Sequence, residues 1–208
     1  MSRFLALAAV VLISSGVLAA DPKPVVGLGI VSADEKLVFL PGKDGVEAVE
    51  LATGKQVWAS KDAKKIAGAS DKVVVGWVAE EKKANIFRVV AFDAATGKTL
   101  GKSDPIALPD WASVEPTYGR TFRTAAKAGD DAVTVFWQAN AFYAGGARPT
   151  PEIEEAARKN ERGLVKVDIK TGKVAVADGK PKDDDFKAGP AGGFEPKAAG
   201  YEFQQKEE

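Results

Sequence analysis

Short runs of alternating apolar and polar residues follow one another along most of the chain and predict β-strands. The runs are rich in β-branched and aromatic side chains, and each ends at a cluster of turn-forming residues. This partial period of two is typical of half-buried strands. The clearest runs cover residues 46–51, 87–92 and 164–169, and a shorter apolar segment follows each of them at 56–58, 99–100 and 174–176.

A turn signature separates each long run from its short successor. It consists of an apolar residue, an acid, two variable residues and then Thr-Gly-Lys. The acid and the threonine hydroxyl can accept hydrogen bonds from backbone N–H groups of the turn, and glycine supplies the positive φ that tight turns need. We therefore interpret these residues as structural turn residues: Glu50, Thr53 and Gly54; Asp93, Thr96 and Gly97; Asp168, Thr171 and Gly172.

A second, weaker repeat lies upstream of each signature, where a polar turn enters an apolar strand at 32–39, 69–75 and 128–135. Each unit thus predicts a four-stranded antiparallel meander, the unit of a propeller blade. We expect an all-β fold of about three such blades, at about 25–60, 64–104 and 118–178, which form an incomplete propeller within a repeat domain at 25–178. The Gly-, Pro- and charge-rich segment 179–208 predicts a disordered tail.

The spacing between the repeats is largest in the third unit, where a helical insert is expected. Thr150 is a candidate N-cap, Pro151 a first helical residue and Gly163 a stop, so the pattern predicts a helix over 151–162. Pairs four residues apart, Glu154 with Arg158 and Glu155 with Lys159, support it. A proline-containing insert around 104–111 predicts an ordered loop.

The turn signature resembles the repeat of pyrroloquinoline-quinone-type β-propellers, which runs Ala-x-Asp-x-x-Thr-Gly-Lys-x-x-Trp. Residues 48–58 match it closely, with Glu50 in place of Asp and Trp58 at the final position. The resemblance covers roughly 28–178 and implies that Trp58 docks one blade on the next. In the second and third units, Leu100 with Gly101 and then Val176 stand near the position of that tryptophan.

The same resemblance separates two kinds of family member. Quinone dehydrogenases of this family have about eight blades, a vicinal cysteine pair and a calcium site, none of which is recognisable in this sequence. Non-catalytic members, such as scaffold subunits of outer-membrane assembly machinery, keep the repeat without the cofactor. The resemblance therefore implies a shortened, quinoprotein-like member without a cofactor.

Residues 1–20 have the three-part pattern of a secretory signal. Arg3 is followed by an apolar run to Ile13, then by Ser14, Ser15 and Gly16, and by small residues up to Ala20. The rival interpretation is a membrane anchor, but the run of about ten residues is shorter than the ~20 needed to span a bilayer. We expect cleavage near Ala20 or Asp21, a periplasmic or secreted protein, and no integral membrane span after signal removal.

The amino-acid composition excludes several kinds of functional site. The chain of 208 residues has equal numbers of basic and acidic residues, 29 of each, and no cysteine or histidine. A near-neutral chain lacks the basic footprint of nucleic-acid binding. Disulfides, thiolate metal sites and cysteine nucleophiles are excluded, as are the commonest general base and zinc ligand. No catalytic, cofactor-binding or metal-ligating residue is predicted.

Four residues outside the repeats form the candidate binding surface. Trp111 lies in the proline-containing insert, Phe142 and Tyr143 end the most aromatic stretch of the chain, 136–143, and Arg148 lies in the loop that follows it. Aromatic side chains in loops are suited to stacking on a ligand or a partner. Trp77 and Trp137, which lie in predicted strands, are expected to pack between blades. The contiguous acids 183–185 lack the spacing of a calcium loop and read as a solvated charge run.

Two function classes remain open from the sequence. The first is an exported, non-catalytic repeat module that binds a protein or ligand, with an unknown protein partner or self-association covering its blade flanks. The alternative is a fragment of, or a degenerate, quinone-dependent dehydrogenase, because the absence of His and Cys does not exclude catalysis by carboxylates.

Overall fold

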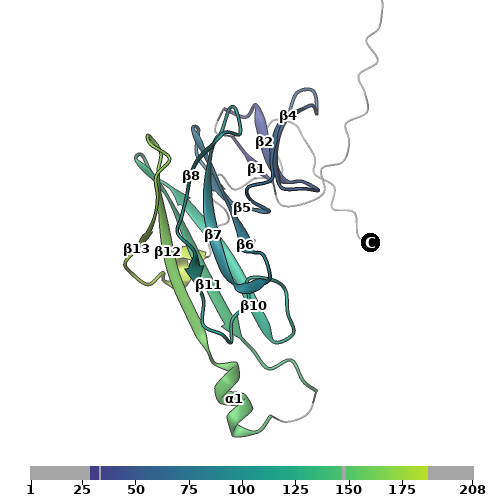
Figure 1. Ribbon diagram of the computed structural model, residues 1–208, viewed down its shortest axis with the longest axis vertical. Helices are drawn as coiled ribbons and strands as arrows, with labels where there is room; N and C mark the ends of the chain where they lie inside the picture. Colours follow the sequence, from purple (N-terminus) through teal and green to yellow (C-terminus); the bar gives the residue numbers. More distant parts are fainter. Residues whose placement is uncertain (1–28, 33, 147–148, 187–208) are drawn as a thin grey trace, which may run out of the picture.

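The computed structural model describes residues 29–32, 34–146 and 149–186, which form three antiparallel sheets in chain order (Figure 1). Within each sheet the strands are hydrogen-bonded in sequence order, so that each sheet is a meander. Blade 1 contains β1 (Ile30–Val31), β2 (Leu37–Pro41), β3 (Val46–Glu50) and β4 (Gln56–Ser60). The fold is therefore all-β and propeller-like, as the repeats predict, and it is an incomplete propeller of three blades.

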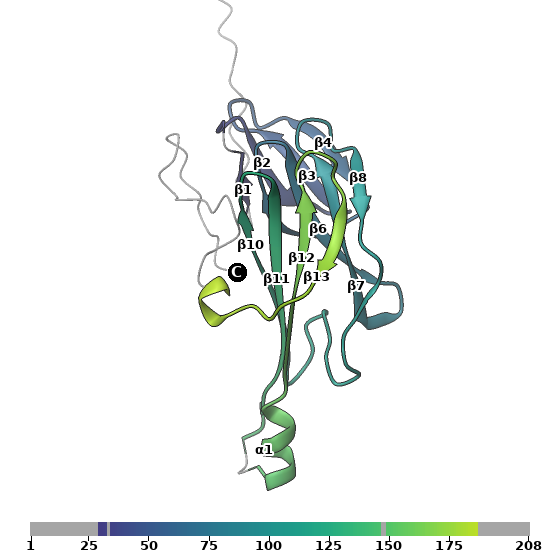
Figure 2. The same cartoon turned by 90° about the vertical axis from the view of Figure 1, so that its left-hand side faces the viewer.

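The longest strands of blades 2 and 3 exceed those of blade 1. Blade 2 contains β5 (Lys65–Ala69), β6 (Val73–Glu80), β7 (Lys83–Asp93), β8 (Thr99–Lys102) and the short β9 (Ile106–Ala107), which also pairs with β7. Blade 3 contains β10 (Arg120–Ala128), β11 (Ala132–Ala141), β12 (Asn160–Asp168) and β13 (Val174–Ala177). Figure 2 shows the strands of blade 3 beside those of blade 2, with α1 (Pro151–Ala157) projecting from one end.

Blade 2 is the middle layer and buries both of its faces. Along β6, Val73 and Val75 belong to the core shared with blade 3, whereas Val74 belongs to the core shared with blade 1. All three are fully buried. A strand buried on both faces needs no polar alternation, and this explains why the sequence of β6 begins with three consecutive valines.

An aromatic cluster fills the core between blades 2 and 3. Phe122 contacts both Trp77 and Phe87 edge-on, with ring centroids 5.1 Å apart in each pair, and Phe87 contacts Trp137 at 5.9 Å. Edge-to-face contacts of this kind add to the free energy of burial. Trp77 and Trp137 thus pack between blades, as expected.

The helical insert is shorter than predicted. Helix α1 ends at Ala157, and Gly163 lies inside β12 rather than at a helix end. Gly163 pairs with Trp137 of β11, and a Cβ at this position would collide with the Trp137 ring. The glycine that resembles a helix stop is therefore a packing residue of the sheet. The expected ion pair of Glu154 with Arg158 is present at 3.7 Å.

The segment after β13 differs from the expected disordered tail in its first residues. Asp183–Phe186 forms a 3-10 turn, η1, on the face of blade 3 that points away from blade 2. The Phe186 ring stacks under the guanidinium of Arg123 at 4.6 Å, and Asp183 pairs with Arg162 at 2.6 Å. The acidic run is thus partly engaged rather than fully solvated, and residues 187–208 lie outside the described part of the chain.

Candidate functional site

The three Thr-Gly-Lys turns share one geometry. Gly54, Gly97 and Gly172 have φ angles of 65°, 70° and 71°, the positive values that the signature requires. In each turn the glycine N–H donates to the backbone carbonyl of the acid at 2.8 Å. The threonine hydroxyl donates to the acid side chain, at 2.7 Å for Thr96 to Asp93 and 2.8 Å for Thr171 to Asp168, and Thr53 donates to Glu50 in the same way.

These contacts within the turns hold the two aspartates in their charged form. The hydroxyl of Thr96, helped by its N–H, lowers the pKa of Asp93 below its ordinary value. The N–H and then the hydroxyl of Thr171 lower the pKa of Asp168. Donors aimed at a carboxylate favour its ionised form. Each acid is therefore satisfied inside its own repeat and plays the structural role that its position predicts.

Each turn glycine of blades 2 and 3 also receives a side chain from the preceding blade. The Trp58 ring lies over Gly97, where a Cβ would approach it to 2.5 Å, and Trp58 Nε1–H donates to Ala94 O at 2.9 Å. Leu100 of blade 2, one residue before the position equivalent to Trp58, lies over Gly172 of blade 3. Trp58 thus docks blade 1 on blade 2, whereas a Cβ at Gly54 of blade 1 would meet no atom of the described residues within 4 Å.

Val176 does not occupy the docking position that the sequence alignment gives it. In blades 1 and 2 the strand after the turn carries one extra residue, Val57 or Leu100, between the pairs Val49–Gln56 and Ala48–Trp58 or Phe92–Thr99 and Ala91–Gly101. In blade 1 this bulge places Trp58 opposite Ala48, on the face that packs against blade 2. Blade 3 pairs without a bulge, so Val176 lies opposite Val165, whose side chain belongs to the core shared with blade 2. The exposed Val176 therefore points to the face of the sheet that packs against blade 2, and blade 3 does not repeat the docking contact.

The candidate binding surface lies at the other end of blade 3, where a hollow of about 270 Å³ opens between the insert of blade 2, the ends of β10 and β11, and α1. Trp111, Phe142 and Tyr143, which the sequence singles out, all line it, and Arg148 lies outside the described residues. We call this hollow the aromatic groove. Its lining residues are Trp111, Tyr118, Gly119, Arg120, Ala141, Phe142, Tyr143, Ala144, Ile153, Ala156, Ala157 and Lys159.

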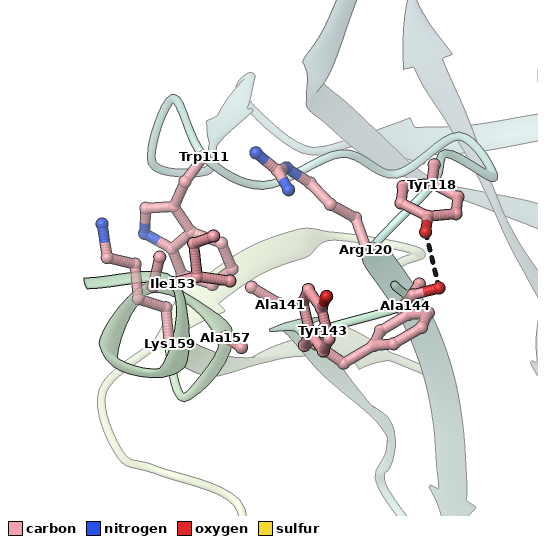
Figure 3. A pocket seen from close by; sticks show the side chains of 12 residues that line it. Trp111, Tyr118, Arg120, Ala141, Tyr143, Ala144, Ile153, Ala157 and Lys159 are labelled. Carbon is pink, nitrogen blue, oxygen red and sulfur yellow. Dashed lines mark hydrogen bonds between the residues drawn. The ribbon is translucent and has the colours of Figure 1, made fainter. Parts of the chain in front are cut away.

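Backbone pairing of blade 3 positions these side chains. Phe142 N–H donates to Gly119 O, and Ala141 N–H donates to Lys159 O, both at 2.9 Å, so the three strands remain joined at the groove. Tyr118 Oη donates to Ala144 O at 2.5 Å and fixes the loop after β11 (Figure 3). The chain then returns to β12 through α1, whose first residue, Pro151, has the fixed φ that suits a helix start.

Apolar side chains dominate the groove, and several are exposed. Phe142 is 46% exposed, Ile153 44% and Tyr118 77%. Figure 3 shows Trp111 beside Ile153 of α1, with Tyr118 farther along the groove. Exposed aromatic side chains gathered in a concave surface are typical of a binding site.

The charged groups that line the groove are both basic. Arg120 at the start of β10 and Lys159 just before β12 contribute to its walls, and the lining residues include no acid. The groove therefore combines apolar side chains with two cations, and acids adjoin its lining residues at Asp110 and in α1. It suits a ligand that carries an aromatic or aliphatic group next to a carboxylate or another anion.

Sequence reasoning missed Tyr118, Arg120, Ile153 and Lys159. Tyr118 and Arg120 lie at the entrance to β10, and the other two belong to the helical insert or follow it. The signal that could have found them is their shared position next to the two inserts, since both inserts join the strands of blades 2 and 3 at the same end.

Residues 29–32, 34–146 and 149–186 contain no group of three His, Cys, Asp or Glu residues arranged to hold a metal ion. Over the same ranges, no helix has the length and apolar character that crossing a membrane requires. Neither a protein-family model nor a curated protein matches the chain.

Proposed function

We propose that the chain is an exported, non-catalytic β-propeller-repeat module that binds its ligand in the aromatic groove. The export rests on the signal pattern of residues 1–20, and the repeat class rests on the resemblance of the Thr-Gly-Lys turns to pyrroloquinoline-quinone-type propellers. The three-blade arrangement supports the repeat assignment. The aromatic groove is the proposed binding site.

One observation carries the proposal: aromatic residues from separate segments converge in one hollow outside the repeated part of the blades. Trp111 comes from the insert of blade 2, Tyr118 from the entrance to β10, and Phe142 with Tyr143 from the exit of β11. The repeat does not require aromatic residues at these positions. Packing alone also gives no reason for side chains that remain 36–77% exposed at three of the four positions.

The carboxylates that the sequence offers for catalysis are engaged in turns. Asp93 and Asp168 accept hydrogen bonds from Thr96 and Thr171, and Glu50 accepts one from Thr53. They lie in three separate blades, one in each turn. This arrangement favours the binding module over the degenerate dehydrogenase as the proposal.

The groove is tested with two capped peptides, acetyl-Ala-Phe-Glu-Ala-amide and acetyl-Ala-Phe-Lys-Ala-amide, titrated into the full mature chain. NMR of the tryptophan indole signals reports the binding, and the Trp111 signal is assigned with W111F. We expect the Glu peptide to shift the Trp111 signal and to bind about tenfold more tightly than the Lys peptide, because Arg120 and Lys159 attract its carboxylate.

The matched variants are F142A in the groove and V57A at the opposite end of the blades, where Val57 is 50% exposed. F142A is expected to weaken the Glu peptide at least fivefold, whereas V57A leaves its affinity unchanged. Equal affinity for both peptides, or equal loss in both variants, would overturn the proposed site. Sequencing of the exported protein tests the export: a start near Ala20 or Asp21 supports it, and an intact Met1 contradicts it.

A further inference from the structure

We propose that the aromatic groove is occupied by the chain's own C-terminal segment, residues 194–203, which binds in cis and competes with external ligands. This inference rests on the proposed function, because it takes the groove to be a binding site. It adds an identified occupant and a regulatory consequence: an external ligand must displace the segment before it can bind.

The chemistry of the segment matches that of the groove. Phe194 is followed directly by Glu195, and Tyr201, Glu202 and Phe203 are consecutive. Each group places an aromatic ring next to a carboxylate, the combination that the apolar floor and the two cations Arg120 and Lys159 favour. Since no acid lines the groove, neither glutamate faces like charge from the lining residues.

The structure anchors the chain on the outer face of blade 3, eight residues before this segment. Phe186 stacks under Arg123 of β10 and contacts Phe136 of β11 edge-on, with ring centroids of the two phenylalanines 6.4 Å apart. Arg162 of β12 reaches the same turn through Asp183 and through the carbonyl of Pro181. The chain therefore leaves blade 3 from a fixed point on its outer face.

The distance from that point to the groove is short. Arg123, which holds Phe186, lies three residues after Arg120 in the same strand, and three residues of strand extend about 10 Å. The two side chains point to opposite faces of blade 3, so the segment has to pass around the sheet to enter the groove. Phe194 follows Phe186 by eight residues, which span up to about 26 Å when extended. Both aromatic groups of the segment can therefore reach the groove, and glycines at 189, 192 and 193 ease the turns that the path requires.

A tether of this length makes weak binding effective. A short flexible connection gives the tethered group an effective concentration in the millimolar range. A segment with only millimolar intrinsic affinity thus occupies a substantial fraction of the grooves. The apparent affinity of an external ligand falls by the fraction of grooves that remain open.

The first experiment measures the Glu peptide described above on the full chain and on F194A/Y201A/F203A. We expect the triple variant to bind the peptide about three- to tenfold more tightly, because its groove is unoccupied. The matched control, K197A/K206A, replaces one lysine of the segment and one just after it and keeps all the aromatic groups. It is expected to retain the affinity of the unaltered chain. Equal affinities in all three chains would overturn occupation by the segment while leaving the proposed function intact. Absence of Trp111-dependent binding in every chain would instead refute the proposed function.

The second experiment locates the segment directly. The chain has no cysteine, so a nitroxide can be attached at A199C alone. It should broaden the Trp111 indole signal, and a label at K55C, in the turn of blade 1, should not. Broadening that persists on dilution supports binding in cis, whereas broadening that disappears on dilution assigns the contact to a second copy and contradicts the proposal. The substitution R120E in the labelled chain is expected to reduce the broadening.

Discussion

The two ends of blade 3 are built from different kinds of residue. At one end, the turn between β12 and β13 repeats the turns of the other two blades, and its polar groups are satisfied within it. At the other end, β11 leaves the blade through the loop and helix that line the aromatic groove, and exposed aromatic side chains gather there. The repeated end holds the blades together, whereas the unrepeated end presents side chains outward.

In this molecule, residues that repeat from blade to blade have structural roles, whereas exposed residues that occur once are candidates for binding. A residue that recurs in each blade is explained by a need that each blade has, such as a turn or a docking contact. Gly54, Gly97 and Gly172 meet such a need, since each supplies the positive φ of its turn. A residue that occurs once and stays exposed, such as Phe142, has no such explanation and is the better candidate for binding. Trp111 also occurs once, but it is partly buried and packs against the core between blades 2 and 3.

The largest expected effect tests the docking role of the repeated end. Gly97 and Gly54 have the same positive φ, but only Gly97 lies under Trp58. We expect G54A to cost about 1–2 kcal/mol, the usual penalty for a left-handed conformation. G97A should cost about 3–4 kcal/mol, because it adds overpacking against the tryptophan. Urea denaturation of the two variants measures the difference, and equal costs would show that Trp58 does not dock on this turn.

The outer face of blade 3 provides a smaller test. F186A removes the stacking on Arg123 and Phe136 and is expected to destabilise the protein by about 1 kcal/mol. The matched variant V176A truncates an apolar side chain that is 58% exposed and should change stability by less than about 0.5 kcal/mol. If both variants melt like the unaltered chain, η1 contributes nothing to the stability of blade 3.

At the groove end, substitutions are expected to weaken peptide binding while changing stability little. I153A and F142A remove side chains that are 44% and 46% exposed, so each should alter the free energy of unfolding by less than about 1 kcal/mol. Both should weaken the Glu peptide. A loss of stability comparable to that of G97A would mean that the groove residues are part of the core and would remove the distinction between the two ends.

The sequence predicts the repeated end well because its signals are local. The acid, the threonine and the glycine of each turn interact with one another over four or five residues, so their spacing defines their geometry. Gly163 shows the limit of such signals. A glycine that follows a helical pattern suggests a helix end, yet its role is set by Trp137 on the neighbouring strand.

The position of Val176 and the extent of the groove also depend on contacts between distant segments. Val176 follows its turn at the expected spacing, but the missing bulge in the pairing of β12 with β13 rotates it to the other face. The sequence identified Trp111, Phe142 and Tyr143 as exposed aromatic candidates. The sequence alone could not predict that Tyr118 and Ile153 lie beside these residues. Their proximity depends on the pairing of β10 with β11 and on the return of the chain through α1.

The smallest expected effect is the response to low pH, which should weaken the turns of the repeated end first. The pKa values of Asp93 and Asp168 are lowered by donors from Thr96 and Thr171, so the folded state binds protons less readily than the unfolded chain. Their contribution to stability is therefore complete above the ordinary aspartate pKa of about 3.9 and is lost as the pH falls through the lower, folded values. At the groove end, the Phe142 amide donates to the Gly119 carbonyl, which does not titrate.

Hydrogen exchange between pH 5 and pH 2.5, corrected for the intrinsic pH dependence of exchange, separates the two ends. Protection of the Thr96 and Thr171 amides, which donate to the aspartates at 2.8 and 2.7 Å, should fall before that of the Phe142 amide. In D93N/D168N, which keeps an acceptor oxygen but not the titratable group, the early loss at both threonines should disappear. Simultaneous loss of protection at all three amides in the unaltered chain would show that acid unfolds the blade as a unit, and that the two ends do not differ in their response to pH.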